Sequence, residues 1–175
     1  MTRAARRLLR SEDGSATIEF VLLFPAFIAL FLATFELGMT MMRQVMLDRA
    51  LDLAVRDVRV GTLDPVTHDD LKRAICARAQ MIPDCANQVR LEMLRVDPRN
   101  WRGVADEADC VDRADRSRPA RTFVPGVSNQ LVVVRACALF DPYFPTTGLG
   151  AELAEGRGFY ALLSSSAFVV EPRSS

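Results

Sequence analysis

The sequence predicts an α+β protein, in which a long N-terminal transmembrane helix continues into a small domain with one short helix and an antiparallel sheet of about three strands. Two observations predict this class: an apolar run that starts near Ile18, and three later segments with the composition of strands. A third is the length of 175 residues, which allows one membrane segment and at most one small domain. We therefore expect an anchored globular domain.

The apolar run is long enough to cross a bilayer. It carries no charge from Phe20 to Phe35 and stays largely apolar to about Met46. A hydrocarbon core of about 30 Å needs roughly 20 helical residues, and Ile18 to Met42 meets that requirement. Four arginines precede the run: Arg3, Arg6, Arg7 and Arg10. Because positive charge stays on the cytoplasmic side, we expect a cytoplasmic amino end and a translocated chain after about Met46.

The helix is expected to continue beyond the membrane over residues 15–61 as a whole. After about Met46 its apolar residues recur at helical spacing and the opposite face is charged, which is typical of an amphipathic helix. The apolar positions are Leu47, Leu51, Ala54, Val55 and Val58. Pro25 removes one helical hydrogen bond, so a kink is expected there. A separate short helix after the anchor is the alternative.

Residues 62–175 are expected to form the translocated α+β domain. Thr67 followed by Asp70 indicates a helix start, and the helix is predicted to reach about Gln80. Strands are predicted at 88–96, 131–140 and 159–170, the second of them central because it is apolar on both faces. In the first strand, Arg90 and Glu92 are expected to point outward, with a bulge or strand end at Leu94. Residues 97–130 have no period and are predicted to be a long surface loop with solvated charges.

All four cysteines lie in the part predicted to be translocated, which favours disulfides formed in an oxidising compartment. Four cysteines allow three pairings, and the sequence alone cannot choose among them. Local geometry favours Cys76 with Cys85, across the turn that contains Pro83, and Cys110 with Cys137 would follow. A metal site is disfavoured because there is no Cys-x-x-Cys and His68 is the only histidine.

Charge and motifs exclude several classes of function. Lys+Arg and Asp+Glu are equal at 22 each, which argues against a nucleic-acid partner. There is no second histidine, no Gly-x-Ser-x-Gly and no apolar cluster of acids, so we expect no enzyme, no cofactor and no small-molecule substrate. The Gly-Leu-Gly at 148–150 and the Gly-Arg-Gly at 156–158 lack the residues of a phosphate cradle and are interpreted as turns.

The start of the apolar run holds an unusual acid, Glu19. An acid in a membrane segment is unfavourable and usually has a partner. Taken alone, Glu19 is explained by its place at the interface, where it reaches headgroups or favours the helix N-terminus. Its spacing adds a second explanation, because Glu19 lies five residues after Gly14 and behind a short basic leader, residues 1–14.

The run Gly-Ser-Ala-Thr-Ile-Glu-Phe-Val-Leu-Leu-Phe-Pro from Gly14, continuing to Phe35-Glu36-Leu37-Gly38, resembles the TadE-like pseudopilins of the tight-adherence (Flp-type) pilus system. The ending Phe168-Val169-Val170-Glu171-Pro172 also resembles that family. The resemblance implies a pilin-like fold and a prepilin peptidase that cuts between Gly14 and Ser15. It also implies that Glu19 docks to a neighbouring subunit by pairing with a freed amino group.

That resemblance implies a minor pilin or pseudopilin that takes part in assembling a type IVb Flp/Tad adhesion pilus. Its expected partners are the bacterial inner membrane, the prepilin peptidase, sibling pseudopilins in a hetero-oligomer, and the pilus assembly platform. The domain would lie in the periplasm or enter the pilus. The alternative is a generic single-pass membrane-anchored periplasmic binding module, which would keep its leader.

Overall fold

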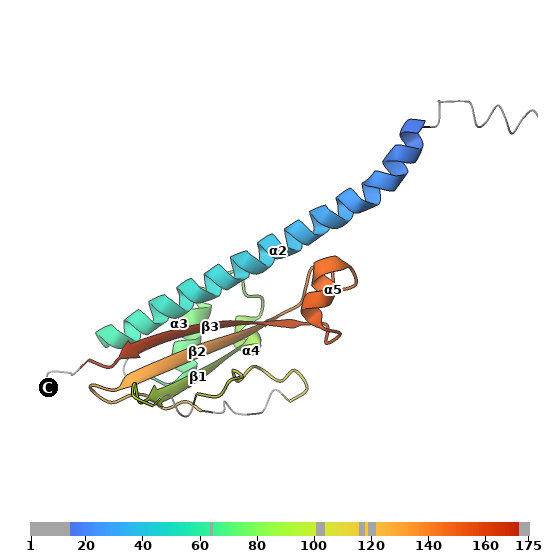
Figure 1. Ribbon diagram of the computed structural model, residues 1–175. Coiled ribbons are helices and arrows are strands. Elements are labelled where there is room, and N and C mark those ends of the chain that lie inside the picture. The colour runs from blue at the N-terminus through green and yellow to red at the C-terminus, as the bar shows by residue number, and fades with distance from the viewer. Residues whose placement is uncertain (1–14, 64, 101–103, 116–117, 119–121, 172–175) are drawn as a thin grey trace, which may run out of the picture.

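The computed structural model describes residues 15–63, 65–100, 104–115, 118 and 122–171. The expected leader, 1–14, lies outside the described residues. A single long helix crosses one face of a three-stranded sheet and projects far beyond it at its N-terminal end (Figure 1). This arrangement confirms the predicted α+β class.

The long helix, α2 (Ser15–Val60), has 46 residues and a length of about 70 Å. No break separates an anchor from a second helix, and Pro25 lies inside the helix without ending it. The helix ends where Gly61 takes a positive φ of 78°. There the Thr62 N–H bonds the Asp57 carbonyl at 3.0 Å, and the Gly61 N–H bonds the Val58 carbonyl at 3.2 Å. Glycine reaches this left-handed conformation at no steric cost and satisfies the last carbonyls of the helix.

The short helix α3 (His68–Cys76) starts as its sequence predicts. The Thr67 side chain accepts a hydrogen bond from the Asp70 N–H, while its hydroxyl donates to the Asp70 carboxylate at 2.5 Å. Arg73 also binds that carboxylate, and the two contacts hold the pKa of Asp70 below its ordinary value. The predicted end near Gln80 is too late. After Cys76 the chain tightens into turns that lead to α4 (Cys85–Gln88).

The sheet has the strand order β1-β2-β3 and is antiparallel throughout, with β1 (Val89–Val96), β2 (Leu131–Phe140) and β3 (Tyr160–Val169). The central position predicted for 131–140 is confirmed. The expected bulge at Leu94 is wrong, since β1 pairs with β2 in unbroken register from Val89 opposite Ala138 to Val96 opposite Leu131. Leu94 pairs with Val133 within that ladder.

The hydrophobic core lies between the sheet and two helices, α2 and α3. The helices contribute Leu47, Leu51, Ala54, Val55, Leu71 and Ile75, and alternate strand residues contribute Val89, Leu91, Met93, Val132, Val134, Ala136, Ala138 and Phe168. The amphipathic stripe predicted after Met46 therefore covers the sheet. Half of α2 is thus a core element of the domain, because these side chains leave water only when the helix lies on the sheet.

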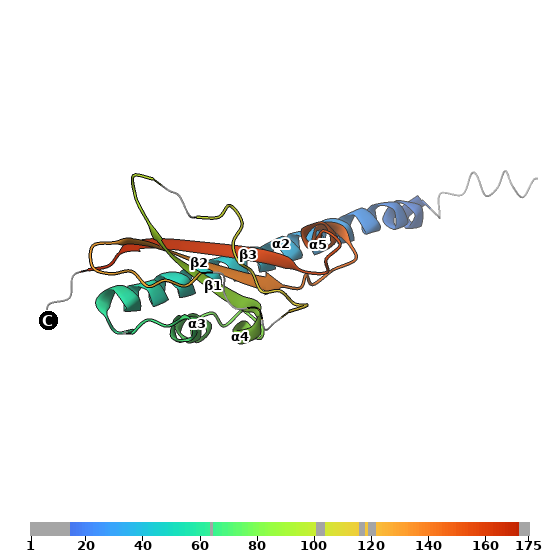
Figure 2. The same cartoon turned by 90° about the horizontal axis from the view of Figure 1, so that it is seen from below.

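The opposite face of the sheet is also buried, and this corrects two expectations. Arg90 and Glu92 were expected to face solvent but are 6% and 3% exposed. Glu92 pairs across the strands with Arg135 at 3.2 Å, and Arg90 approaches Asp109 of the long loop at 3.6 Å. The described part of residues 97–130 covers β1 and β2 on the side away from α2 (Figures 1 and 2). The loop is irregular as predicted, but its buried Asp109 lies between Arg90 of the sheet and Arg118 of the loop, as a buried charge requires.

Two further links fix this loop to the sheet. The structure joins the four cysteines in the expected pairs, Cys76–Cys85 and Cys110–Cys137. The second pair ties the loop to the central strand. Farther on, the Met93 N–H bonds the Thr122 carbonyl at 3.1 Å and the Val124 N–H bonds the Met93 carbonyl at 2.9 Å, so this part of the loop continues the pairing at the free edge of β1.

Two short helices were not predicted. One is α4 (Cys85–Gln88), and the other lies in the connection after β2. The segment with the sequence Gly-Leu-Gly, interpreted as a turn, begins the helix α5 (Gly148–Ala154). α5 lies beyond the end of the sheet, beside the N-terminal half of α2 (Figures 1 and 2). Gly150 explains why the helix can pack there: a Cβ on this residue would lie 2.4 Å from the carbonyl oxygen of Phe144. Only glycine permits that approach of one backbone to another.

Candidate functional site

The N-terminal part of α2 has its apolar side chains outside the protein. From Ile18 to Phe35 the large hydrophobic residues are mostly exposed, among them Phe20 at 60%, Leu22 at 71% and Leu30 at 68%. By length and composition, Thr17–Val60 is one helix able to cross a membrane, and its most apolar window is not buried by the rest of the chain. Such a surface is unfavourable in water, and it fits a single-pass membrane anchor.

The site residues predicted near the N-terminal end of this helix follow one another along the chain. Gly14 lies outside the described residues. Ser15 is the first residue of α2, and Glu19 follows one turn later on the exposed surface. Pro25 lies farther along, where it lines a cleft described below. The cleavage, docking and kink roles expected for these residues stay predictions.

A second acid on α2 has a clear structural partner. Glu36 is 1% exposed, and its carboxylate accepts backbone hydrogen bonds from the loop after β2. The Tyr143 N–H lies 3.1 Å from Oε1 and 3.0 Å from Oε2, and the Phe144 N–H lies 3.0 Å from Oε2. A carboxylate that accepts two adjacent backbone N–H groups fixes both the position and the direction of that loop. Glu36 therefore joins the anchor helix to the domain.

Two turns later, Arg43 makes a second junction with the same loop. Its guanidinium donates to the Tyr160 hydroxyl at 2.8 Å and to the Asp141 carbonyl at 3.2 Å. The same group lies over the rings of Phe140 and Tyr143, at 4.9 Å and 4.5 Å from their centroids. Arg43 is only 5% exposed, so these contacts replace the water that a buried cation loses.

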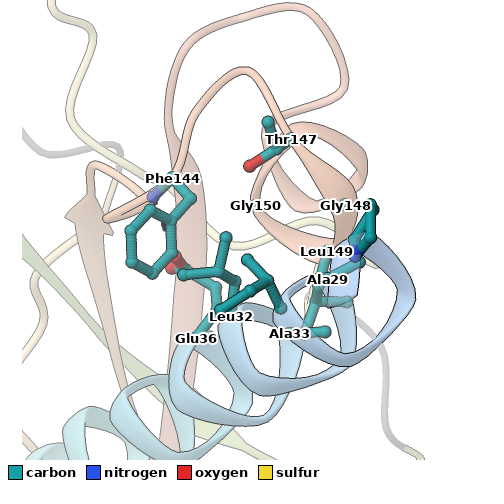
Figure 3. A pocket seen from close by; sticks show the side chains of 11 residues that line it. Ala29, Leu32, Ala33, Glu36, Phe144, Thr147, Gly148, Leu149 and Gly150 are labelled. Carbon is teal, nitrogen blue, oxygen red and sulfur yellow. Dashed lines mark hydrogen bonds between the residues drawn. The ribbon is translucent and has the colours of Figure 1, made fainter. Parts of the chain in front are cut away.

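Between these junctions and the exposed anchor lies an apolar cleft of about 270 Å³. Its first wall is the face of α2 that carries Ile28, Ala29, Leu32 and Ala33. Phe144 and the start of α5, residues 147–150, form the second wall, and Glu36 lies at one end (Figure 3). The cleft is therefore built jointly by the helix expected to be in the membrane and by the domain.

The sequence contained a signal for this junction that the sequence analysis did not use. Between Phe20 and Leu47, Glu36 is the only acid and Arg43 the only base. Ionisable residues in such a segment usually have a protein partner. Their partner loop has a signal of its own, because residues 142–151 carry no charge at all. What the sequence could not show is that the two segments meet, since a long stretch of chain separates them.

In the part of the chain that the structure describes, no group of three or more His, Cys, Asp or Glu side chains is placed to hold a metal ion. At the start of α3, His68 contacts the Asp69 carboxylate at 2.9 Å and lies edge-on to the ring of Phe123. The features that remain are an exposed apolar helix, its acid near the N-terminus and its junction with the domain.

A comparison with known protein families finds a match over the long helix. The family model described as TadE-like protein matches residues 14–56, which runs from the predicted cleavage glycine to the core-facing part of α2. The resemblance drawn from Gly14 to Gly38 is thus confirmed over that segment. A search of curated proteins and a search of solved structures each found no match to the chain.

Proposed function

We propose that this chain, which is TadE-like over residues 14–56, is a minor pilin or pseudopilin that takes part in assembling a Flp/Tad-type adhesion pilus. A TadE-like protein is associated with the Tad pilus and is a structural component rather than an enzyme. In this proposal a prepilin peptidase removes residues 1–14 at the cytoplasmic face of the inner membrane. The mature chain then begins at Ser15, its domain lies in the periplasm, and sibling pseudopilins and the assembly platform are its partners.

One observation carries the proposal: a glycine five residues before an acid, at the head of a 46-residue helix whose first half is apolar and exposed. Apolar helices can associate side by side in a bilayer through packing and polar contacts. An acid near the end of such a helix is favourable when a cation of a neighbour meets it. A new amino terminus created at Ser15 would supply that cation.

The amino terminus of the mature protein tests the cleavage step. Mass spectrometry of the chain purified from cells with an active prepilin peptidase is expected to show Ser15 first, and Met1 first when the peptidase gene is deleted. Gly14→Leu is expected to block removal of the leader, because a side chain at that position obstructs a narrow protease site. Ala5→Leu, in the same leader, is the control and is expected to be processed normally. A chain that begins at Met1 in peptidase-active cells would refute the proposal and favour the alternative, a membrane-anchored binding module.

The docking role of Glu19 is tested separately. Glu19→Ala is expected to abolish incorporation into the pilus assembly while the chain still enters the membrane and loses its leader. Glu152→Ala, an exposed acid on α5, serves as the control and is expected to assemble. The measurement is co-purification with the sibling subunits and the count of surface pili. Normal assembly of the Glu19→Ala chain would exclude docking through this carboxylate.

A further inference from the structure

The burial of its residues divides α2 into two segments that meet at Glu36. From Thr17 to Phe35 no residue of the helix is buried, and Glu36 is the first buried one, followed by Arg43 and then Leu47. The stretch from Thr17 to Phe35 corresponds to about 28 Å of helix, close to the roughly 30 Å of a bilayer's hydrocarbon core. If this stretch fills the hydrocarbon core, the core ends at Glu36, ten residues before the limit at about Met46 that the sequence predicts.

Three aromatic rings meet at this level. Phe35 lies edge-on to Tyr143 at 5.6 Å and to Phe144 at 6.0 Å between ring centroids. Phe35 and Tyr143 are 43% and 45% exposed, so the group faces outward. Amphipathic aromatic rings such as Tyr concentrate at the boundary between headgroups and hydrocarbon. The group therefore marks the same boundary that the length of the helix gives.

The loop beside these rings is suited to a low-dielectric environment. Residues 142–151 contain no charged side chain, and the first charge after them is Glu152. The N–H groups of Tyr143 and Phe144 are bonded to Glu36, and the Thr147 N–H bonds the Phe144 carbonyl. Irregular backbone is tolerated at membrane depth only when the protein satisfies its polar groups. These bonds meet that condition where the loop approaches α2.

The cleft between α2 and α5 opens on the membrane side of this boundary. Ile28, Ala29, Leu32 and Ala33 all precede Phe35 on α2, so a bilayer that ends at Glu36 places them at hydrocarbon depth. Residues 147–150 of the loop and of α5 face them across the cleft (Figure 3). With about 270 Å³ the cleft is near the lower limit of roughly 300 Å³ for small-molecule pockets, and its apolar walls offer few groups to orient a polar ligand. A flexible hydrocarbon chain fits both its size and its lining.

We propose that this cleft holds an acyl chain of a membrane phospholipid, and that α5 with residues 142–151 is a foot by which the domain rests in the outer lipid interface. Glu36 then has a structural role at the boundary, since it fixes the foot to the anchor helix. The inference depends on membrane insertion of α2 but not on removal of the leader or on pilus assembly.

Fluorescence quenching by brominated lipids tests the foot. The full chain is inserted into phosphatidylcholine vesicles whose acyl chains carry bromine, with its natural Trp101 replaced by Phe and one new tryptophan introduced. In Leu149→Trp, at the start of α5, the brominated chains are expected to quench most of the tryptophan emission. In Val127→Trp, which is exposed in the loop before β2, the emission is expected to be unchanged. Equal emission from both variants would overturn the proposal.

A pair of matched substitutions tests the acyl chain itself. Ala33→Phe fills the cleft, whereas Ala26→Phe places the same ring on an exposed part of α2 outside it. Native mass spectrometry of the chain released from mild detergent is expected to show a retained phospholipid with the unaltered protein and with Ala26→Phe, and its loss with Ala33→Phe. Loss or retention in both variants alike would overturn the proposal. So would efficient disulfide cross-linking of Ala33→Cys between two chains in lipid vesicles, because a second copy would then occupy the cleft.

Discussion

At the scale of single residues, Glu36 is the acid with the best-defined contacts on α2. Its carboxylate receives the N–H groups of Tyr143 and Phe144, and no other side chain could offer two acceptor oxygens from the same position on the helix except a shorter aspartate. A charged acceptor also makes stronger hydrogen bonds than a neutral one. The residue thus sets where the loop after β2 meets the helix.

Glu36→Gln is expected to weaken this junction while keeping its shape. The amide has one acceptor oxygen, and its NH₂ group would face a backbone donor, so about 1–3 kcal/mol of loop stability should be lost. Hydrogen exchange of the Tyr143 and Phe144 amides in detergent measures it, and both should exchange faster. Glu152→Gln, an exposed acid on α5, is the control and should leave both rates unchanged. Unchanged protection in Glu36→Gln would show that the loop is held by other contacts.

At the scale of elements, α5 depends on one close approach of backbones. An alanine at position 150 would place its Cβ 2.4 Å from the Phe144 carbonyl oxygen, whereas a Cβ at Gly38 on α2 meets nothing within 4 Å. Gly150→Ala is therefore expected to displace α5 and to lower thermal stability. Gly38→Ala should raise helix stability by up to about 1 kcal/mol, because alanine is the better helix former. Thermal unfolding of both variants in the same detergent compares them, and a stabilising Gly150→Ala would contradict the packing described here.

The two disulfides connect elements over different lengths of chain. Cys76–Cys85 joins residues nine apart, and Cys110–Cys137 joins residues 27 apart. On the chain-entropy account, the longer loop contributes about 3.5 kcal/mol and the shorter about 2.6 kcal/mol. Replacing Cys110 with Ser and Cys137 with Ala should then lower the free energy of unfolding more than the equivalent change at Cys76 and Cys85. Denaturant titration of both double variants measures the difference, and the reverse order would show that native-state strain or residual structure dominates.

Elements with a local signal were predictable from the sequence. Thr67 and Asp70 predict the start of α3, Gly61 predicts the end of α2, and the apolar run at 131–134 predicts a central strand. The misinterpreted parts depend on contacts between distant segments. Arg90 and Glu92 alternate as in a half-exposed strand, yet they are buried because Asp109 and Arg135 supply opposite charges. α5 is short and rich in glycine, so its propensity alone predicts a turn.

The candidate site likewise has one part that the local sequence predicts and another that depends on contacts between distant segments. The anchor and its spacing from Gly14 to Glu19 are continuous in the sequence and were found there. The junction at Glu36 and the cleft beside it need a helix residue and a loop that lies 107 residues later. A charge in an apolar segment indicates that a partner exists, but it does not say which segment supplies it.

At the scale of the whole molecule, the C-terminal half of α2 belongs to the domain. Leu47, Leu51 and Ala54 are 0% exposed because they cover the sheet, so a domain without them would expose that face to water. A fragment of residues 35–175 keeps this stripe together with Glu36 and Arg43. It is expected to fold in oxidising conditions and to unfold in one cooperative transition. Its exposed remainder of anchor helix is short enough for study in mild detergent.

A fragment of residues 61–175 is the matched comparison, since it keeps every strand, α3, α5 and both disulfides but lacks α2. Burying a leucine-sized side chain contributes about 1.5–3 kcal/mol, so loss of the stripe removes several such contributions from a domain whose stability is about 5–15 kcal/mol. Circular dichroism and thermal unfolding are expected to show no cooperative transition for this fragment. A cooperative transition equal to that of 35–175 would mean that the sheet and α3 are sufficient, and that α2 only anchors the domain. We expect this loss of cooperative unfolding because α2 has two roles: its first half lies in lipid, and its second half is part of the protein core.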